Sequence, residues 1–278
     1  MLTHSEISYS QCPVVAGALF WAQHQKDPTN AKYDLKDKLC PVPSQQMDVL
    51  SRSTHLCCAS WLRASIGTLR HSPWREVWNS PVAQDIRKSI HDGSYRYCNN
   101  LLCPKIQGNQ VPYKSTLAQT EPMFASIIAK QQVELDTGPQ SINLSYDATC
   151  NLSCPSCRTE KIATDNATRD AYQEMQEKSI MPLLKEAKTV LITGSGDPFA
   201  SKNFRDVLMR INDEDYPNLS VLLMTNGLLL TPNEWNKFKH LAGKISRISV
   251  SIDGASKESH EITRRGSNWE KRALSENS

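Results

Sequence analysis

The sequence lacks a strong charge of either sign and any long hydrophobic run. Its 278 residues carry 32 basic and 29 acidic side chains, a formal net charge of only +3. That balance gives no electrostatic reason to expect a nucleic-acid partner. No run of about 18 apolar residues is present to span a bilayer, and the N-terminus lacks the basic start and apolar stretch of a signal peptide. We therefore expect a cytoplasmic protein with neither a nucleic-acid nor a membrane partner.

Several motifs are also missing. The sequence has no GxSxG, no GxGxxG after a strand, and no repeat of 20–50 residues. It therefore gives no support to Ser-His-Asp catalysis, dinucleotide binding or a solenoid. With 39% apolar and 22% charged residues, the composition is ordinary for a folded globular chain.

Cysteine is the residue type that stands out. Six of the nine cysteines lie in the first 104 residues, and three more lie within eight positions further on. Without an export signal, thiols stay reduced, so metal or cluster ligation explains them better than disulfides. Two sites are expected, with a domain at 1–104, a linker at 105–139 that holds one helical turn, and a second domain at 140–278. Cys12 is expected to be a spare thiol.

Hydrophobic periodicity after residue 140 predicts alternating strands and helices. Strands are expected at 141–149, 190–192, 221–224 and 248–252. Helices are expected at 169–184, where Pro182 should end or kink the helix, after Asn203 as N-cap, and after Thr231 as N-cap. Strands that alternate with helices predict parallel βα units, and four strands do not close a barrel.

The first of these strands leads into the segment CNLSCPSC. Cys150, Cys154 and Cys157 can hold three corners of a cubane [4Fe–4S] cluster, and no cysteine follows them, so one iron would remain open. Active sites of βα folds lie at this end of the strands. Structural zinc is the alternative, but it usually wants four closed ligands, and the downstream His240 and His260 make no ligand pair.

These residues resemble the radical S-adenosylmethionine (radical SAM) superfamily, whose motif CxxxCxxC they meet. The resemblance implies an α/β fold, a partial (β/α) radical SAM barrel, apparently truncated here after the fourth strand. It implies that SAM chelates the open iron through its amino and carboxylate groups. Reduction of the cluster then cleaves SAM to methionine and a 5′-deoxyadenosyl radical, which abstracts hydrogen from a substrate. Ser156 departs from the family, since many members have an aromatic residue there.

The resemblance extends to the loop after the second strand. Ser195-Gly196-Asp197-Pro198 stands where the family has GGEP, whose backbone and acid meet the SAM amino group, and Gly194 just before it is a further expected contact. Small residues let the backbone approach a ligand, and an acid suits an ammonium group. The alternative is a turn that merely needs glycine.

The end of the fourth strand matches the ribose contacts of the family at Ser251 and Asp253. Asp253 is equally explained as an ordinary turn residue. Arg264 and Arg265 follow; one of them pairs with the SAM carboxylate, or both are a solvated surface pair.

The N-terminal cysteine segment shows two helix starts, Ser72-Pro73 and Ser80-Pro81, and Gly93 is a good stop for the second helix. The apolar positions that this second helix is expected to bury are Val82, Ile86 and Ile90. So short a segment has little core of its own, which indicates that something else stabilises it.

Four thiols of this segment are candidates for that role: Cys40, Cys57 or Cys58, Cys98 and Cys103. They suit a cluster or zinc, because four cysteines close a tetrahedral site. Residues 38–104 resemble the SPASM/twitch auxiliary iron–sulfur cluster domain of radical SAM enzymes, although in relatives this domain usually follows the barrel. Spacing does not decide between Cys57 and Cys58, and we favour Cys57.

The leading hypothesis is therefore a radical SAM enzyme with one catalytic and one auxiliary [4Fe–4S] cluster and with SAM as cofactor. The resemblance implies an electron donor such as flavodoxin or ferredoxin, and a peptide, protein or small-molecule substrate. The alternative is a non-catalytic binding module, stapled by zinc or an iron–sulfur cluster, or an inactive barrel fragment.

Overall fold

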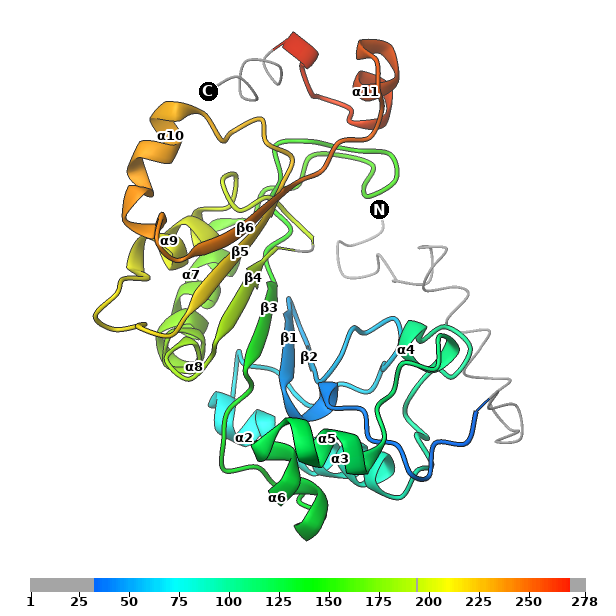
Figure 1. Cartoon of the computed structure of the whole chain (residues 1–278). Coiled ribbons are helices and arrows are strands. Elements are labelled where there is room, and N and C mark those ends of the chain that lie inside the picture. The colour runs from blue at the N-terminus through cyan, green and yellow to red at the C-terminus, as the bar shows by residue number, and fades with distance from the viewer. Residues whose placement is uncertain (1–32, 194, 271–278) are drawn as a thin grey trace, which may run out of the picture.

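One six-stranded sheet organises the fold in the computed structural model, which describes residues 33–193 and 195–270. The strands run in the order β2-β1-β3-β4-β5-β6, and all neighbouring pairs are parallel except β1 and β2 (Figure 1). Their bounds are β1 Gln46–Leu50, β2 Thr54–His55, β3 Ser141–Ser145, β4 Thr189–Ile192, β5 Ser220–Thr225 and β6 Ile245–Val250.

The four strands predicted from periodicity are β3 to β6, and their parallel arrangement is confirmed. Sequence reasoning missed β1 and β2, which come from the cysteine-rich N-terminal segment. β1 pairs with β3 in parallel, with Met47 opposite Ile142 and Val49 opposite Leu144. The sheet therefore runs without a break from the cysteine-rich segment into the βα units.

Most helices lie in two groups in Figure 1, while α4 and α11 lie apart from both. One group lies beside β4 and β5, and the other lies around the start of β1 and β3. The bounds are α2 Trp74–Trp78, α3 Pro81–His91, α4 Pro104–Gln107, α5 Lys114–Thr120, α6 Pro122–Lys130, α7 Asn166–Met175, α8 Met181–Leu184, α9 Lys202–Arg210, α10 Pro232–Lys237 and α11 Lys257–Thr263. Shorter turns are η3 Val42–Ser44, the π-helical η4 Gln176–Ile180 and η5 Lys239–Leu241.

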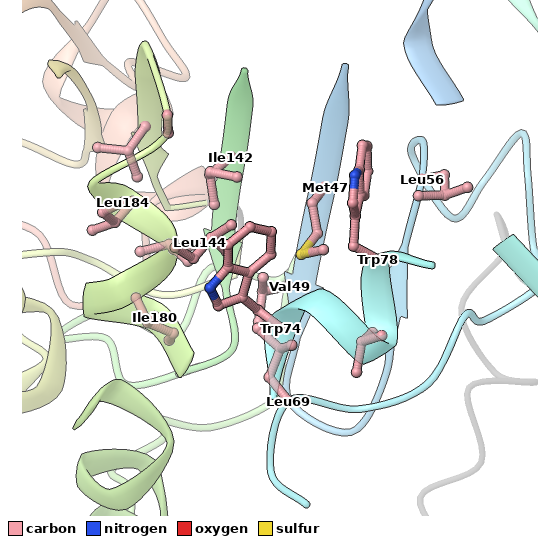
Figure 2. Close-up of a cluster of buried hydrophobic side chains, with 14 of the residues drawn as sticks. Met47, Val49, Leu56, Leu69, Trp74, Trp78, Ile142, Leu144, Ile180 and Leu184 are labelled. Atoms are coloured by element: carbon pink, nitrogen blue, oxygen red, sulfur yellow. The ribbon is translucent and has the colours of Figure 1, made fainter. Parts of the chain in front are cut away.

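A single core joins the two parts of the chain. Alternate residues of β1 and β3 point to the same side of the sheet and are buried. Figure 2 shows these side chains with Trp74 of α2 among them. Ile180 and Leu184 of the η4–α8 segment lie on the left in this view, beside the residues of β3. The cysteine-rich segment is thus packed on the βα units and does not stand apart from them.

The helical run around Pro182 ends where expected, at residue 184, and begins at Asn166, slightly before the expected start. The helical run continues from α7 through η4 into α8 and ends at Leu184. Proline lacks an N–H and its ring crowds the carbonyl four residues earlier, so it normally breaks an α-helix. Here the π-helical turn changes the hydrogen-bond register just before Pro182, which lies in the first turn of α8.

Two helix caps were predicted correctly and two were wrong. At α2 the N-cap position is held by Pro73 and not by Ser72. Ser80 caps α3 and Thr231 caps α10, as expected. The cap of α9 is Ser201, whose Oγ accepts from the backbone N–H of Phe204 at 3.0 Å. Asn203, the expected cap, instead donates from its side-chain amide to Asp147, which lies far away in the sequence.

The segment at 105–139, expected to connect domains with one helical turn, contains α4, α5 and α6. Leu117, Phe124 and Ile127 of α5 and α6 are buried, so this connection adds to the core. No helix within the described residues is long and apolar enough to cross a membrane.

On α3 the expected burial holds at Ile86 and Ile90 but was wrong at Val82, which is 40% exposed. We expect Ile86→Ala to lower the free energy of unfolding by about 2–5 kcal/mol, because it removes a fully buried side chain. Val82→Ala should change it by no more than about 0.5 kcal/mol. Urea titration of both variants in metal-free form measures the difference, and equal losses would contradict this packing of α3.

Candidate functional site

The three cysteines of the CxxxCxxC loop lie on the wall of one cavity of about 190 Å³. Cys154 is buried, Cys150 is half-buried and Cys157 is exposed. The cavity opens where β3 to β6 end, as expected for a βα architecture. Its other lining residues are Ser156, Arg158, Thr193, Ser195, Gly196, Met224, Thr225, Asn226, Ser251, Asp253 and Arg264.

A buried carboxylate holds the base of this loop. Asp147 follows β3 and accepts hydrogen bonds from the Thr149 N–H at 2.9 Å and from the Thr164 hydroxyl at 2.6 Å, so both ends of the loop meet there. Ser201 and Asn203 at the start of α9 donate to its other oxygen, at 2.6 and 2.8 Å. Burial alone would raise the pKa of Asp147, but hydrogen bonds from Asn203, Ser201 and Thr164 hold it below its usual value.

The loop after β4 is pressed against the same backbone. A Cβ at Gly196 would lie 2.5 Å from the Asp147 carbonyl oxygen and 2.6 Å from that of Thr149, so only glycine fits. The Asp197 N–H donates to the Thr149 carbonyl at 2.9 Å. Gly196 is thus required by the contact between two loops and not only by the turn.

Each sulfur of the loop faces a polar donor from the chain. The pairs are Asn226 Nδ2 with Cys150 at 3.8 Å, Arg264 with Cys154 at 4.0 Å and Arg158 with Cys157 at 3.3 Å. Burial raises the pKa of the Cys150 thiol. A metal bound to the thiol would offset this cost of forming the thiolate.

Of the expected contacts to SAM, Ser195, Gly196, Ser251 and Asp253 line the cavity. Gly194 lies outside the described residues. Asp253 forms an ion pair with Arg264 at 2.9 Å, so it does more than end a strand.

Asp197 has a different environment from the one expected. Its carboxylate is buried and is absent from the cavity lining. It accepts hydrogen bonds from the Thr225 hydroxyl at 2.7 Å and from the backbone N–H groups of Asn226 and Phe199, at 2.9 and 3.0 Å. Its side chain therefore ties the loop after β4 to the end of β5.

A second cavity, of about 120 Å³, is lined by five cysteines of the N-terminal segment. They are Cys40, Cys57, Cys58, Cys98 and Cys103. The remaining wall is mostly apolar, from Val42, Pro43, Trp61, Leu62, Tyr95, Ile106 and Val111. Trp61 is thus part of this wall.

Tyr95 brings two of these cysteines together. Its buried hydroxyl accepts from the Cys40 N–H at 3.0 Å and donates to the Lys38 carbonyl at 3.1 Å. Its own carbonyl accepts from the Cys98 N–H at 2.8 Å. The position of Tyr95 thus links the segment before β1 to the loop after α3.

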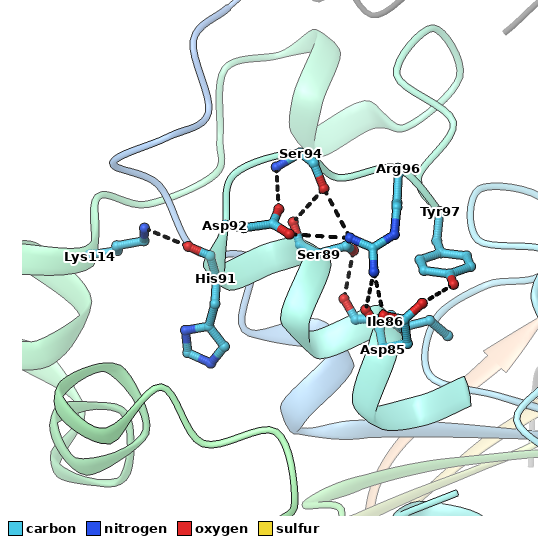
Figure 3. Close-up of polar contacts among 9 residues, drawn as sticks. All are labelled: Asp85, Ile86, Ser89, His91, Asp92, Ser94, Arg96, Tyr97 and Lys114. Carbon is cyan, nitrogen blue, oxygen red and sulfur yellow. Dashed lines mark hydrogen bonds and ion pairs between the residues drawn. The ribbon is translucent and has the colours of Figure 1, made fainter. Parts of the chain in front are cut away.

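The loop that carries Cys98 is tied to α3 by charged side chains (Figure 3). Arg96 contacts Asp85 and forms an ion pair with Asp92 at 3.2 Å. The Tyr97 hydroxyl donates to Asp85 and is the main cause of the lowered pKa of that carboxyl group. These contacts fix the chain between α3 and Cys98.

Comparison with known families gives both cavities a context. Residues 146–274 match the radical SAM superfamily, and residues 40–104 match the iron–sulfur cluster-binding domain called SPASM. The chain carries a radical SAM domain and a SPASM domain. A radical SAM domain binds a [4Fe–4S] cluster and SAM, and a SPASM domain binds an auxiliary iron–sulfur cluster.

Curated relatives match about the same length of chain. An AdoMet-dependent heme synthase from Methanosarcina barkeri is 30% identical over 132 residues, which are 46% of this chain and 35% of the relative. A protein of the same name from Nitratidesulfovibrio vulgaris is 26% identical over 46% of this chain and 34% of its own. A GTP 3′,8-cyclase from Peptoclostridium acidaminophilum is 27% identical over 47% of this chain and 39% of its own. The matches thus cover little more than a third of each relative.

The thiols of the SPASM domain form an electrostatically connected group. Burial raises the pKa of Cys40 to about 11 and that of Cys57 to about 12. Burial also raises the pKa of Cys98, and the charges of Cys40, Cys57 and Cys103 raise it further. Cys58 lines the same cavity.

The donor sets of both domains suit iron–sulfur clusters. Soft thiols on a cavity wall are the ligands that such clusters take. Within residues 33–193 and 195–270, no three Cys, His, Asp or Glu side chains lie close enough together to hold one metal ion. A cluster distributes its protein ligands over several irons, whereas a single zinc ion needs all its ligands around one centre.

Sequence reasoning missed Arg158, Asn226 and Thr193 as parts of the radical SAM cavity. Asn226 follows β5 in Thr225-Asn226-Gly227, which reads as a simple strand end. A polar residue at the carboxyl end of a parallel strand was the available signal.

We expect anaerobically reconstituted protein to bind about eight iron atoms per chain, four for each cubane. Replacing Cys150, Cys154 and Cys157 together by Ala should halve the iron content, because the SPASM cavity has its own thiols. Iron and acid-labile sulfide analysis measures this. Stoichiometric zinc without charge-transfer absorbance would contradict the assignment, as would loss of all iron from a variant that still folds.

The two adjacent cysteines provide a second test. Cys57→Ser should lose the iron of the SPASM domain, because the buried Cys57 thiol interacts electrostatically with those of Cys40, Cys98 and Cys103. Cys58→Ser is the matched control and should keep that iron. The reverse result would move the ligand by one residue, and equal tolerance of both changes would discard this set of four.

Proposed function

We propose that this protein is a radical SAM enzyme in which Cys150, Cys154 and Cys157 hold the catalytic [4Fe–4S] cluster. The observation that carries the proposal is the shared cavity, which joins these thiols to the loops after β4, β5 and β6. When bound, the cluster and SAM would supply reductive cleavage of SAM to a 5′-deoxyadenosyl radical, which abstracts hydrogen from a substrate. Three thiolates leave one iron open for SAM.

The loop after β4 would meet the amino group of SAM through its backbone. Ser195 and Gly196 line the cavity, whereas the Asp197 carboxylate is committed to Thr225 and Asn226. In our proposal Asp197 therefore acts indirectly, by holding this backbone against the end of β5. The role of an acid facing the ammonium group would then fall to another residue or to the carbonyl oxygens of the loop.

The loop after β6 would bind the ribose and carboxylate of SAM. Ser251 and Asp253 both line the cavity and offer hydroxyl and carboxylate oxygens to ribose hydroxyls. Arg264, which is paired with Asp253, faces the same space and suits a carboxylate ligand. Of the two consecutive arginines, Arg264 is the candidate for this role, because Arg265 is bound to Ser153 and Thr159.

The SPASM domain would hold the auxiliary cluster with Cys40, Cys57, Cys98 and Cys103. Its cavity wall is mostly apolar, which limits water access and thereby tunes the cluster. We propose that an external donor of the flavodoxin or ferredoxin class supplies electrons. The substrate in this proposal is a peptide or a small organic molecule. The similarity to an AdoMet-dependent heme synthase and to a GTP 3′,8-cyclase supports the second class.

The proposal is tested by the cleavage of SAM. Reconstituted protein with strong chemical reductant should form 5′-deoxyadenosine, measured by liquid chromatography, because the cavity has the parts needed to bind SAM at the cluster. Cys154→Ala should reduce product to the level without protein, since it removes a ligand. Cys58→Ser is the control and should retain product formation.

The opposite result would favour a non-catalytic module. Protein with full iron content that forms no 5′-deoxyadenosine would support a binding domain stabilised by its clusters. It would contradict the proposal that the protein is an enzyme. Equal product from wild type and Cys154→Ala would show that the cleavage does not come from this site.

A further inference from the structure

Arg158 directly follows the last cysteine of the loop and contacts three separate parts of the radical SAM cavity. One guanidinium nitrogen donates to the Ala148 carbonyl at 2.6 Å, before the loop. The other donates to the Ser195 carbonyl, after β4, and to the Cys157 sulfur at 3.3 Å. A single planar group thus joins the start of the cysteine loop, its last thiol and the loop expected to meet SAM.

The positive charge of Arg158 is not neutralised by a carboxylate. None of the ion pairs formed within the described residues includes Arg158, and its oxygen partners are two neutral carbonyls. Arg264 also lies near a cysteine sulfur, but Asp253 pairs with it at 2.9 Å. Arg158 therefore presents the larger uncompensated charge to the sulfurs.

A positive group hydrogen-bonded to a ligand sulfur favours the reduced form of an iron–sulfur cluster, because reduction adds negative charge. We propose that Arg158 is a positioning residue with two effects. It raises the reduction potential of the cluster at Cys150, Cys154 and Cys157, and it fastens the Ser195 loop for SAM binding. This inference rests on the proposed function, since it needs a cluster at these thiols.

Arginine is required for both effects together. Its rigid fork can bond two carbonyls and a sulfur at once, whereas lysine keeps the charge but offers a single point of contact. Replacement by lysine therefore separates the effect of the charge from the effect of the hydrogen bonds to Ala148 and Ser195. Glutamine removes the charge and most of the contacts.

Arg265 provides the matched control. It binds the same cysteine loop, through the Ser153 carbonyl at 3.1 Å and the Thr159 carbonyl, and its hydrogen bonds within the described residues include none to a sulfur. Arg265→Gln thus removes an arginine that contacts the loop, without removing a hydrogen-bond donor to a cysteine sulfur. A general loosening of the loop would affect both variants.

The experiment is a redox titration of anaerobically reconstituted wild type, R158Q, R158K and R265Q, followed by electron paramagnetic resonance. The signal that persists when Cys150, Cys154 and Cys157 are all replaced by Ala belongs to the SPASM domain and serves as an internal reference. Binding of SAM is measured separately by equilibrium dialysis. Neither readout depends on turnover.

We expect the potential of the catalytic cluster to shift to more negative values in R158Q while the reference potential stays constant. R265Q should match wild type. R158K should keep a potential near that of wild type but bind SAM several-fold more weakly, as should R158Q. If R158Q does not retain this cluster, the inference is judged on R158K alone. It then requires a potential near that of wild type together with weaker SAM binding.

An unchanged potential in R158Q with full iron would overturn the inference, as would an equal shift in R265Q or a shift in R158K as large as that in R158Q. Unchanged SAM binding in both Arg158 variants would contradict the claim that Arg158 holds the Ser195 loop for SAM binding. Absence of iron at this site in the wild type would instead refute the proposed function, so the two failures are distinct.

Discussion

The buried carboxylate of Asp147 is the interaction on which the rest of the radical SAM cavity depends. It receives hydrogen bonds from both ends of the cysteine loop and from the first residues of α9. A buried charge of this kind is tolerable only while these donors stay in place, so the loop and helix are held in one arrangement. Gly196 packs against the backbone of Asp147 and Thr149, and this contact positions the loop after β4 against the start of the cysteine loop. Together these contacts hold the loop that carries the three thiols.

The second constraint is the pairing of β1 with β3. It places the segment between Cys40 and Cys57 on the sheet whose far end carries the cysteine loop. Met47 and Val49 share a core with Ile142 and Leu144, so the SPASM domain and the radical SAM domain cannot move independently without exposing apolar surface (Figure 2). The relative position of the two cysteine cavities is therefore a property of the fold.

The sequence predicted the parts of this arrangement that depend on local patterns. Apolar periodicity was sufficient for β3 to β6, and cysteine spacing was sufficient to suggest two sites. β1 escaped notice because it pairs with β3, nearly a hundred residues away, and β2 because it has only two residues and pairs with β1. The expected cap at Asn203 was wrong for a related reason: its side chain bonds a distant residue, and a local cap rule contains no such partner. The side chain of Asp197 likewise bonds Thr225, which the local sequence does not reveal. Asn226 was missed because only the folded chain brings it to the Cys150 sulfur. Arg158 is next to Cys157 in the sequence, but its contacts with Ala148 and Ser195 exist only in the fold.

The central claim is that Cys150, Cys154 and Cys157 hold a cluster whose open iron binds SAM. Electron paramagnetic resonance of the reduced protein, recorded with and without SAM, tests this most directly. The account predicts that SAM alters one of two cluster signals, and that this signal is the one absent when the three cysteines are replaced by Ala. If SAM left both signals unchanged, or altered the signal that persists in that variant, the account would be contradicted.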